Sequence, residues 1–317
     1  MKKVFLTLIL LGAIVGILQA QTRKYVAQFS HMQGYFNPAL SGYEGSTVRG
    51  FVRNQWAGFE GAPKTYFLSA EMDFADITGN SDPLMANKNA FGLNLLHDEY
   101  GAFAETEMIG NYSSRIQISP RTSFRLGVGV NYNMIRLDGN LLNPDQPEDP
   151  RIMQYLNGFA NMQVLDFNIG GAITHPNYYI SYAVHNANRG AINSGDVFME
   201  RRPRVGVFQA GYRNAMTEQL AVATNIMYRH QTGLPDNIEF NFKVLMMDRL
   251  WLGAGHRRFY ANNVQLGMVF PMVRIGYVYE MPMARSYLLP NTTHEFLAVF
   301  PLFRKNIREN RDEVLIW

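Results

Sequence analysis

The chain has 317 residues and no cysteine, and its 29 lysine and arginine residues against 26 aspartate and glutamate residues give a formal net charge of +3. The lack of cysteine excludes a disulfide framework and a thiolate metal site. A charge so near zero argues against a nucleic-acid partner, because nucleic-acid-binding domains carry a marked excess of basic residues.

The first residues predict a secretory signal peptide, residues 1–20. Lys2 and Lys3 precede an apolar run that ends at Leu18, and the small residue Ala20 stands before the expected cut. This order is typical of a cleaved leader, and the run is too short for a good membrane-spanning helix. Without the leader, 27 basic residues face 26 acidic residues, so the mature chain is almost neutral.

A long two-residue alternation lies between residues 122 and 135. Its apolar positions are Phe124, Leu126, Val128, Val130, Tyr132 and Met134. Strands of soluble proteins usually run about five or six residues, whereas a tilted membrane strand needs roughly nine to eleven. The mean hydropathy of −0.15 is compatible with membrane strands, since lipid-facing and lumen-facing residues average out.

Similar segments recur along the chain and predict about 14 strands. They lie near 46–56, 64–74, 89–98, 105–118, 122–135, 164–174, 178–185, 203–213, 218–230, 236–246, 249–258, 262–270, 272–280 and 294–301. We therefore predict an all-β fold, a transmembrane antiparallel β-barrel of outer-membrane type over residues 46–303. Residues 21–45 are expected to form a periplasmic or lumenal segment before it, and residues 304–317 a periplasmic tail.

The connections between these strands predict the orientation of the barrel. An even strand count places both termini in the periplasm, with short turns on that side and longer loops outside. The long polar stretches 136–163, 186–202 and 281–293 all fall on the expected outer side. Residues 75–88 are the exception, a long connection on the periplasmic side.

The first predicted hairpin carries charges on its inward face. Arg49 and Arg53 alternate with apolar residues and share a face with Gln55, so they are expected to point into the lumen. Trp56 lies on the other face, near a lipid headgroup girdle, where an aromatic ring with a polar tip is favourable.

The turn of this hairpin contains Gly61 and Pro63, whose backbone preferences suit a tight connection. A turn centred near Glu60 places Arg49 opposite Glu71 on the inward face. We expect a lumenal ion pair between them, with a ligand-gating role as the alternative.

Several short motifs form an unusual combination. They are Phe36-Asn37-Pro38-Ala39, Arg53-Asn54-Gln55-Trp56, Gly61-Ala62-Pro63-Lys64-Thr65, Trp251-Leu252-Gly253, Arg274-Ile275-Gly276-Tyr277-Val278-Tyr279 and His294-Glu295. With them the chain resembles the PorP/SprF family of outer-membrane proteins over nearly the whole mature sequence. The amino-acid sequence of residues 181–189 and the extension to residue 317 depart from the family pattern.

The resemblance implies a component of the type IX secretion system of Bacteroidota, which exports cargo proteins or holds secreted adhesins at the cell surface. Its implied partners are periplasmic and outer-membrane secretion-machinery proteins, a secreted cargo or adhesin, and membrane lipid or lipopolysaccharide. No cofactor is implied. The candidate motif and lumenal residues are Asn37, Pro38, Arg49, Arg53, Gln55, Trp56, Gly61, Pro63, Glu71, Tyr277, His294 and Glu295.

A diffusion porin is the main alternative function. Inward polar residues would then line an aqueous path: Arg49, Arg53, Glu71, Asp73, Glu105, Glu107 and Arg115. A barrel of about 14 strands lies between the small filled barrels and the open porins, so the strand count does not decide.

An enzyme is disfavoured by the motifs, because the chain has no HExxH, GxSxG or P-loop sequence. His185 and Asn186 with Ser181 form the one catalytic candidate, and their predicted inward face is wrong for a lipid substrate. The acidic, proline-rich residues 143–149 could bind calcium, although such loops are more often simply solvated.

Overall fold

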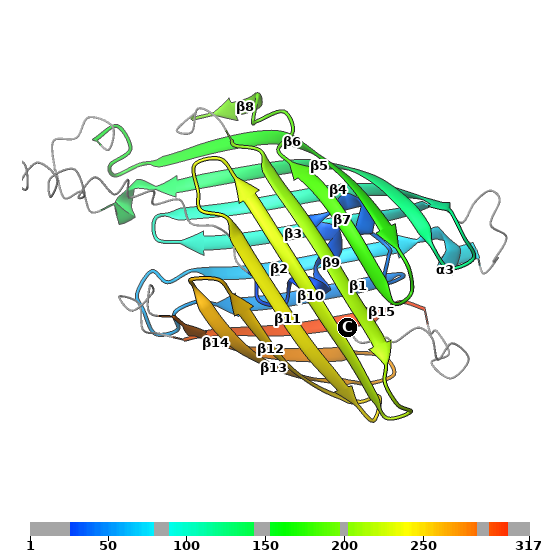
Figure 1. Cartoon of the computed structure of the whole chain (residues 1–317). Coiled ribbons are helices and arrows are strands. Elements are labelled where there is room, and N and C mark those ends of the chain that lie inside the picture. The colour runs from blue at the N-terminus through cyan, green and yellow to red at the C-terminus, as the bar shows by residue number, and fades with distance from the viewer. Residues whose placement is uncertain (1–25, 79–88, 143–152, 197–201, 284–291, 304–317) are drawn as a thin grey trace, which may run out of the picture.

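The computed structural model describes residues 26–78, 89–142, 153–196, 202–283 and 292–303, and its main strands form a closed antiparallel barrel (Figure 1). The 14 strands of the ring are β1 (Thr47–Asn54), β2 (Lys64–Asp73), β3 (Asn89–Tyr100), β4 (Phe103–Gln117), β5 (Ser123–Asp138), β6 (Phe159–Thr174), β7 (Tyr178–His185), β9 (Val205–Ala215), β10 (Leu220–Gln231), β11 (Asn237–Met246), β12 (Leu250–Arg257), β13 (Ala261–Val269), β14 (Arg274–Pro282) and β15 (Thr293–Pro301). Pairing of β1 with β15 and of β5 with β6 completes the ring. The predicted barrel of about 14 strands is confirmed.

The predicted strands agree closely with the observed ones. The largest difference is at β6, which begins five residues earlier than predicted, at Phe159. A further short strand, β8 (Ile192–Gly195), pairs with β6 outside the ring. Its four residues, all exposed, are too few to show an alternation, so the sequence pattern could not predict it.

The alternation in sequence corresponds to the two faces of the barrel wall. In β5, Leu126, Val128 and Val130 are about half exposed on the outer face, while Arg125 and Asn131 are buried on the inner face. An apolar outer face and a polar inner face are the arrangement that a membrane barrel requires.

The two ends of the barrel differ. At the terminal rim, where β1 begins and β15 ends, short connections join the strands at 118–122, 175–177, 216–219, 247–249 and 270–273. The long connection after β2 also starts there, with α3 (Phe74–Thr78). At the opposite end, which we call the loop rim, β5 and β7 end and β6 and β9 begin. Residues 143–149, the calcium candidate, lie outside the described residues, as do 1–25 and 304–317.

Residues 26–46, which we call the inner segment, lie within the ring of strands (Figure 1, dark blue). The segment contains three short helical turns, η1 (Phe29–His31), α2 (Gln33–Phe36) and η2 (Pro38–Leu40). No helix in the described part of the chain is long and apolar enough to cross a membrane.

The main apolar core joins the inner segment to the inward face of the barrel. From the segment it takes Val26, Phe29, Met32 and Phe36, and from the strands Phe51, Phe67, Leu96, Val207, Met227, Leu297 and Val299. These side chains would meet water in an empty lumen, so their burial stabilises the segment within the barrel.

Candidate functional site

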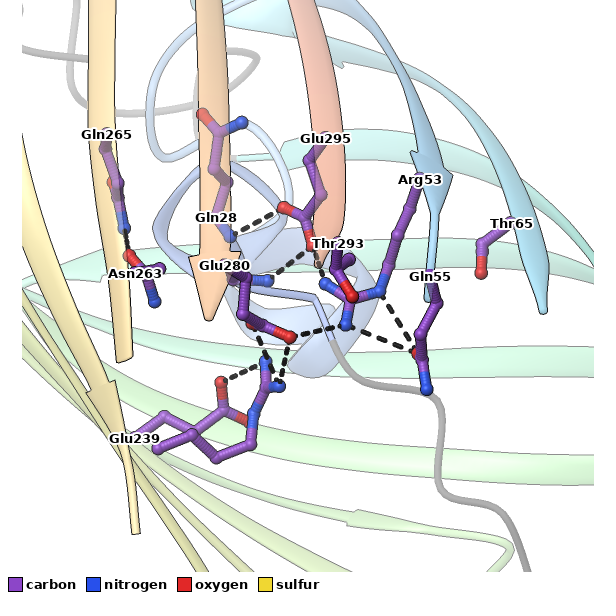
Figure 2. A network of polar contacts seen from close by, with 12 residues as sticks. Gln28, Arg53, Gln55, Thr65, Glu239, Asn263, Gln265, Glu280, Thr293 and Glu295 are labelled. Carbon is purple, nitrogen blue, oxygen red and sulfur yellow. Dashed lines mark hydrogen bonds and ion pairs between the residues drawn. The ribbon is translucent and has the colours of Figure 1, made fainter. Parts of the chain in front are cut away.

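A buried ionic network at the loop-rim half of the lumen centres on Arg53 (Figure 2). The Arg53 side chain is 2% exposed, and its Nη2 lies 2.8 Å from Glu280 Oε1. Its Nη1 contacts Glu295, and its Nε and Nη2 donate to Gln55 Oε1. Arg53 thus joins β1 to β14 and β15 through inward-facing side chains.

Arg257 extends this network along the barrel wall to β12 and β11. Its Nη1 lies 3.1 Å from Glu280 Oε2, and its Nη2 lies 3.1 Å from Glu239 Oε2. Two guanidinium groups therefore face three carboxylates, those of Glu239, Glu280 and Glu295, in a region with almost no solvent exposure. Ions buried this way require close partners, because each loses its hydration.

Glu295 also binds the inner segment. Its carboxylate accepts hydrogen bonds from the backbone N–H groups of Ala27, at 2.9 Å, and Gln28, at 3.3 Å. Asn241 Nδ2 donates to the carbonyl oxygen of Ala27 at 2.7 Å. The ionic network is therefore an attachment point for the start of the segment as well as a tie between strands.

A second attachment point lies at Arg49 and Glu71. Arg49 Nη1 is 2.8 Å from Glu71 Oε1, and Glu71 Oε2 accepts a hydrogen bond from the N–H of Gly42 in the inner segment.

The predicted register of the first hairpin was wrong, because Arg49 stands opposite Ser69. A hydrogen bond from Gln55 N to Pro63 O closes the connection, so its centre is one residue before Glu60. This two-residue shift keeps Arg49 and Glu71 on the same face, and they pair diagonally.

The Asn37-Pro38-Ala39 motif forms the part of the segment nearest to β5 and β6. Asn37 is fully buried, and its Oδ1 accepts from Ala39 N at 2.9 Å while its Nδ2 donates to Gly171 O at 3.2 Å. Pro38 begins η2, where a missing N–H costs nothing. A Cβ on Gly127 would come within 2.6 Å of Ala39 Cα, so the wall needs glycine there for the backbone to approach.

The end of the segment is held by polar side chains at the terminal rim. Arg125 Nη1 donates to Ser41 O at 3.1 Å, and Ser113 Oγ donates to the same oxygen at 2.9 Å. Arg213 pairs with Glu44 at 2.8 Å.

Tyr35 connects the segment to a third charge cluster, near the loop rim. Its hydroxyl donates to Glu107 at 2.7 Å, and burial, followed by the Glu107 charge, raises the pKa of Tyr35 well above its ordinary value, so the hydroxyl stays a donor. Arg202, in the connection before β9, pairs with Asp166 at 3.0 Å and with Glu105 and Glu107 at 3.5 Å.

The other candidate residues do not join these clusters. Trp56, Gly61 and Pro63 lie in the loop-rim connection after β1, with positive φ at Trp56 and Gly61. Tyr277 and His294 lie on the outer face, where the Tyr277 hydroxyl is 2.7 Å from His294 Nδ1. Of the candidates, the structure therefore brings together Arg53, Gln55 and Glu295 in one lumenal cluster, Arg49 and Glu71 in another, and Tyr277 and His294 on the outer face.

The sequence reasoning missed Glu239, Arg257 and Glu280. All three occupy inward positions of predicted strands, so charges at alternate positions were the signal that could have found them. The catalytic candidates are not joined, because His185 Nε2 lies 2.7 Å from Phe36 O while Ser181 Oγ approaches Gln209 O at 3.5 Å.

The apolar outer face and the closed ring define an outer-membrane β-barrel that holds residues 26–46 of its own chain inside. The family model described as "Type IX secretion system membrane protein PorP/SprF" matches residues 18–300. The chain belongs to the PorP/SprF family, and the resemblance found in the sequence is confirmed. No curated protein matches it.

Several solved structures are similar in fold. The outer membrane protein Omp33 of Acinetobacter baumannii is 10% identical, with 81% of this chain and 97% of that chain covered and a TM-score of 0.46. The toluene transporter TodX of Pseudomonas putida is 12% identical, with 88% and 93% covered and a TM-score of 0.48. The CymD monoaromatic hydrocarbon channel is 9% identical, with 82% and 88% covered and a TM-score of 0.47. At such identities the likeness concerns the barrel fold alone.

Proposed function

We propose that this barrel is a non-enzymatic docking component of the type IX secretion system, supporting the export or surface attachment of cargo through protein contacts. The family supports the choice of system. The observation that carries the docking role is the inner segment, which packs an apolar core against the strands and forms buried hydrogen bonds on several sides. A lumen occupied in this way favours contacts at the rims over diffusion of solutes through the barrel.

In this proposal the signal peptide is residues 1–20 and both termini are periplasmic. The terminal rim, with residues 75–88 and the tail 304–317, would then face the secretion machinery. The loop rim, with residues 136–163, 186–202 and 281–293, would face the cell exterior, where cargo or an adhesin is met. The motif residues act indirectly, since Asn37, Arg53 and Glu295 hold the segment that keeps the lumen closed.

Deleting residues 304–317 is expected to impair export of a cargo protein while the barrel remains folded in the outer membrane. The strand pairs that join β15 to β1 and to β14 end by Pro301, before the tail begins. Cargo in the culture medium and on the cell surface is measured in a strain whose only copy is the truncated protein. Heat-modifiable gel mobility and membrane abundance serve as the folding control. Normal export at normal abundance would remove the tail from the proposal.

A further inference from the structure

A groove lies on the outer face of the barrel wall, across β13, β14, β15, β1, β2 and β3, with a volume of about 1060 Å³. Its floor is formed by Gly50 and Ala298, which are paired directly across β1 and β15. The same cross-strand row continues into Ile275 on one side and Leu68 on the other. Two small residues in a row of large ones leave a depression in the wall.

The sides of the groove are apolar and face the bilayer. Val52 and Phe296 stand beside the floor in the next row toward the loop rim, flanked by Tyr66 and Tyr277. Val52, Tyr66 and Phe296 are exposed by 45%, 44% and 60% on this outer face. In a membrane barrel such a surface meets hydrocarbon, so an acyl chain is the natural occupant.

A row of polar side chains lies just beyond the loop-rim end of the groove. His294, Asn54, Lys64 and Glu99 follow one another in register on β15, β1, β2 and β3. Asn54, Lys64 and Glu99 are exposed on the outer face. The boundary between this row and the apolar groove matches the division of a lipid into headgroup and chain.

Two histidines reinforce this row from the outer face. His97, next to Tyr66 in register, lies 2.8 Å from Thr106 Oγ1 and 3.3 Å from Glu99 Oε1. His294 is held by the Tyr277 hydroxyl. Both ring nitrogens of each histidine already have a partner, since His294 Nε2 lies 3.3 Å from Thr292 Oγ1. The ammonium group of Lys64 is therefore the donor that this row offers to a phosphate.

We propose that this groove binds lipid A, the phosphorylated and acylated part of lipopolysaccharide, with one acyl chain over Gly50 and Ala298 and a phosphate at Lys64. The choice of an outer-leaflet lipid rests on the orientation given under the proposed function. A membrane-embedded partner protein and a second copy of this chain are the other possible occupants. Lipid A is favoured because the ammonium group of Lys64 stands just beyond the loop-rim end of a groove with apolar sides, at the place where a headgroup phosphate would follow an acyl chain.

The test is titration of the delipidated protein in detergent with lipid A, followed by native mass spectrometry. Gly50→Leu fills the floor, and a Cβ there meets only Phe67 O at 3.5 Å, so the barrel tolerates it. We expect lipid A to bind about tenfold more weakly, the factor for losing contact with about two methylene groups. Ala70→Leu is the matched control, because Ala70 is also exposed on the outer face of β2 but lies outside the groove.

The headgroup is tested with Lys64→Gln, which is expected to weaken lipid A binding about fivefold, the factor for one lysine beside an anionic headgroup. Dephosphorylated lipid A should bind the natural protein and Lys64→Gln equally. Equal affinity of Gly50→Leu and the natural protein for lipid A would overturn the proposal. Tighter binding of phosphatidylethanolamine than of lipid A, or a dimer lost in Gly50→Leu, would also overturn it. The titration uses purified protein, so its failure is distinguishable from a failure of the export assay.

Discussion

Arg53→Met is expected to lower the free energy of unfolding by about 3–5 kcal/mol, the range for removing one partner of a buried ion pair. Arg53 and Arg257 together face Glu239, Glu280 and Glu295, so its loss leaves three buried carboxylates with one guanidinium. Because Glu295 also holds the N–H groups of Ala27 and Gln28, the inner segment should loosen as well.

The measurement is denaturant unfolding of the detergent-solubilised barrel, with labelling of Ala27→Cys as a reporter of the segment. The chain has no other cysteine, and Ala27 is buried. The matched control combines Arg53→Met with Glu295→Gln, which removes one charge of each sign and keeps an oxygen for the Ala27 N–H. This double variant should regain much of the free energy of unfolding that Arg53→Met alone loses. The role assigned to Arg53 would be contradicted if Arg53→Met left the free energy of unfolding unchanged and position 27 were labelled as slowly as in a protein that keeps Arg53.

Gly127→Val is expected to displace the inner segment from the wall between β5 and β6. The added side chain would meet the backbone of Pro38 and Ala39, which has no flexible end that could move aside. Overpacking of this kind costs typically about 1–3 kcal/mol, so exposure of the segment should rise roughly five- to 150-fold. A displaced segment should also open a path for ions through the lumen.

Labelling of Ala27→Cys and single-channel conductance in planar bilayers measure the two effects. Gly110→Val is the matched control, since Gly110 lies on the outer face of the neighbouring strand β4 and a Cβ there has nothing within 4 Å. Faster labelling and conductance bursts are expected only for Gly127→Val. Should both variants behave as the natural protein does, the close approach of Ala39 to the wall would be refuted.

The barrel itself could be predicted from the sequence because each membrane strand repeats a local pattern of two residues. The face of a residue follows from the same pattern, and in the structure Arg49, Arg53 and Glu71 are buried on the inner face. The register of the first hairpin could not be fixed this way, because it depends on how the nine-residue connection closes. The predicted register differs from the observed one by two residues. Because side chains alternate between the two faces of a strand, a shift by an even number leaves every side chain on its predicted face.

The lumenal contacts were beyond the sequence pattern for a different reason. The inner segment has no long periodic stretch, and its three helical turns are defined mainly by the wall around them. Arg257 reaches Glu280 across β13, and Arg202 reaches Asp166 from a loop, so these pairs depend on the curvature of the closed ring. Tyr277 and His294 belong to the family motifs yet lie on the outer face.

We propose above that this barrel works through protein contacts while its lumen is occupied. The most direct measurement is affinity purification of the tagged, full-length protein from detergent-solubilised outer membranes, with single-channel recording on the same sample. We expect stoichiometric recovery of periplasmic secretion machinery or a secreted adhesin, together with little conductance. A solitary barrel with a steady, large conductance would contradict the account and would identify the lumenal charges as the lining of a channel.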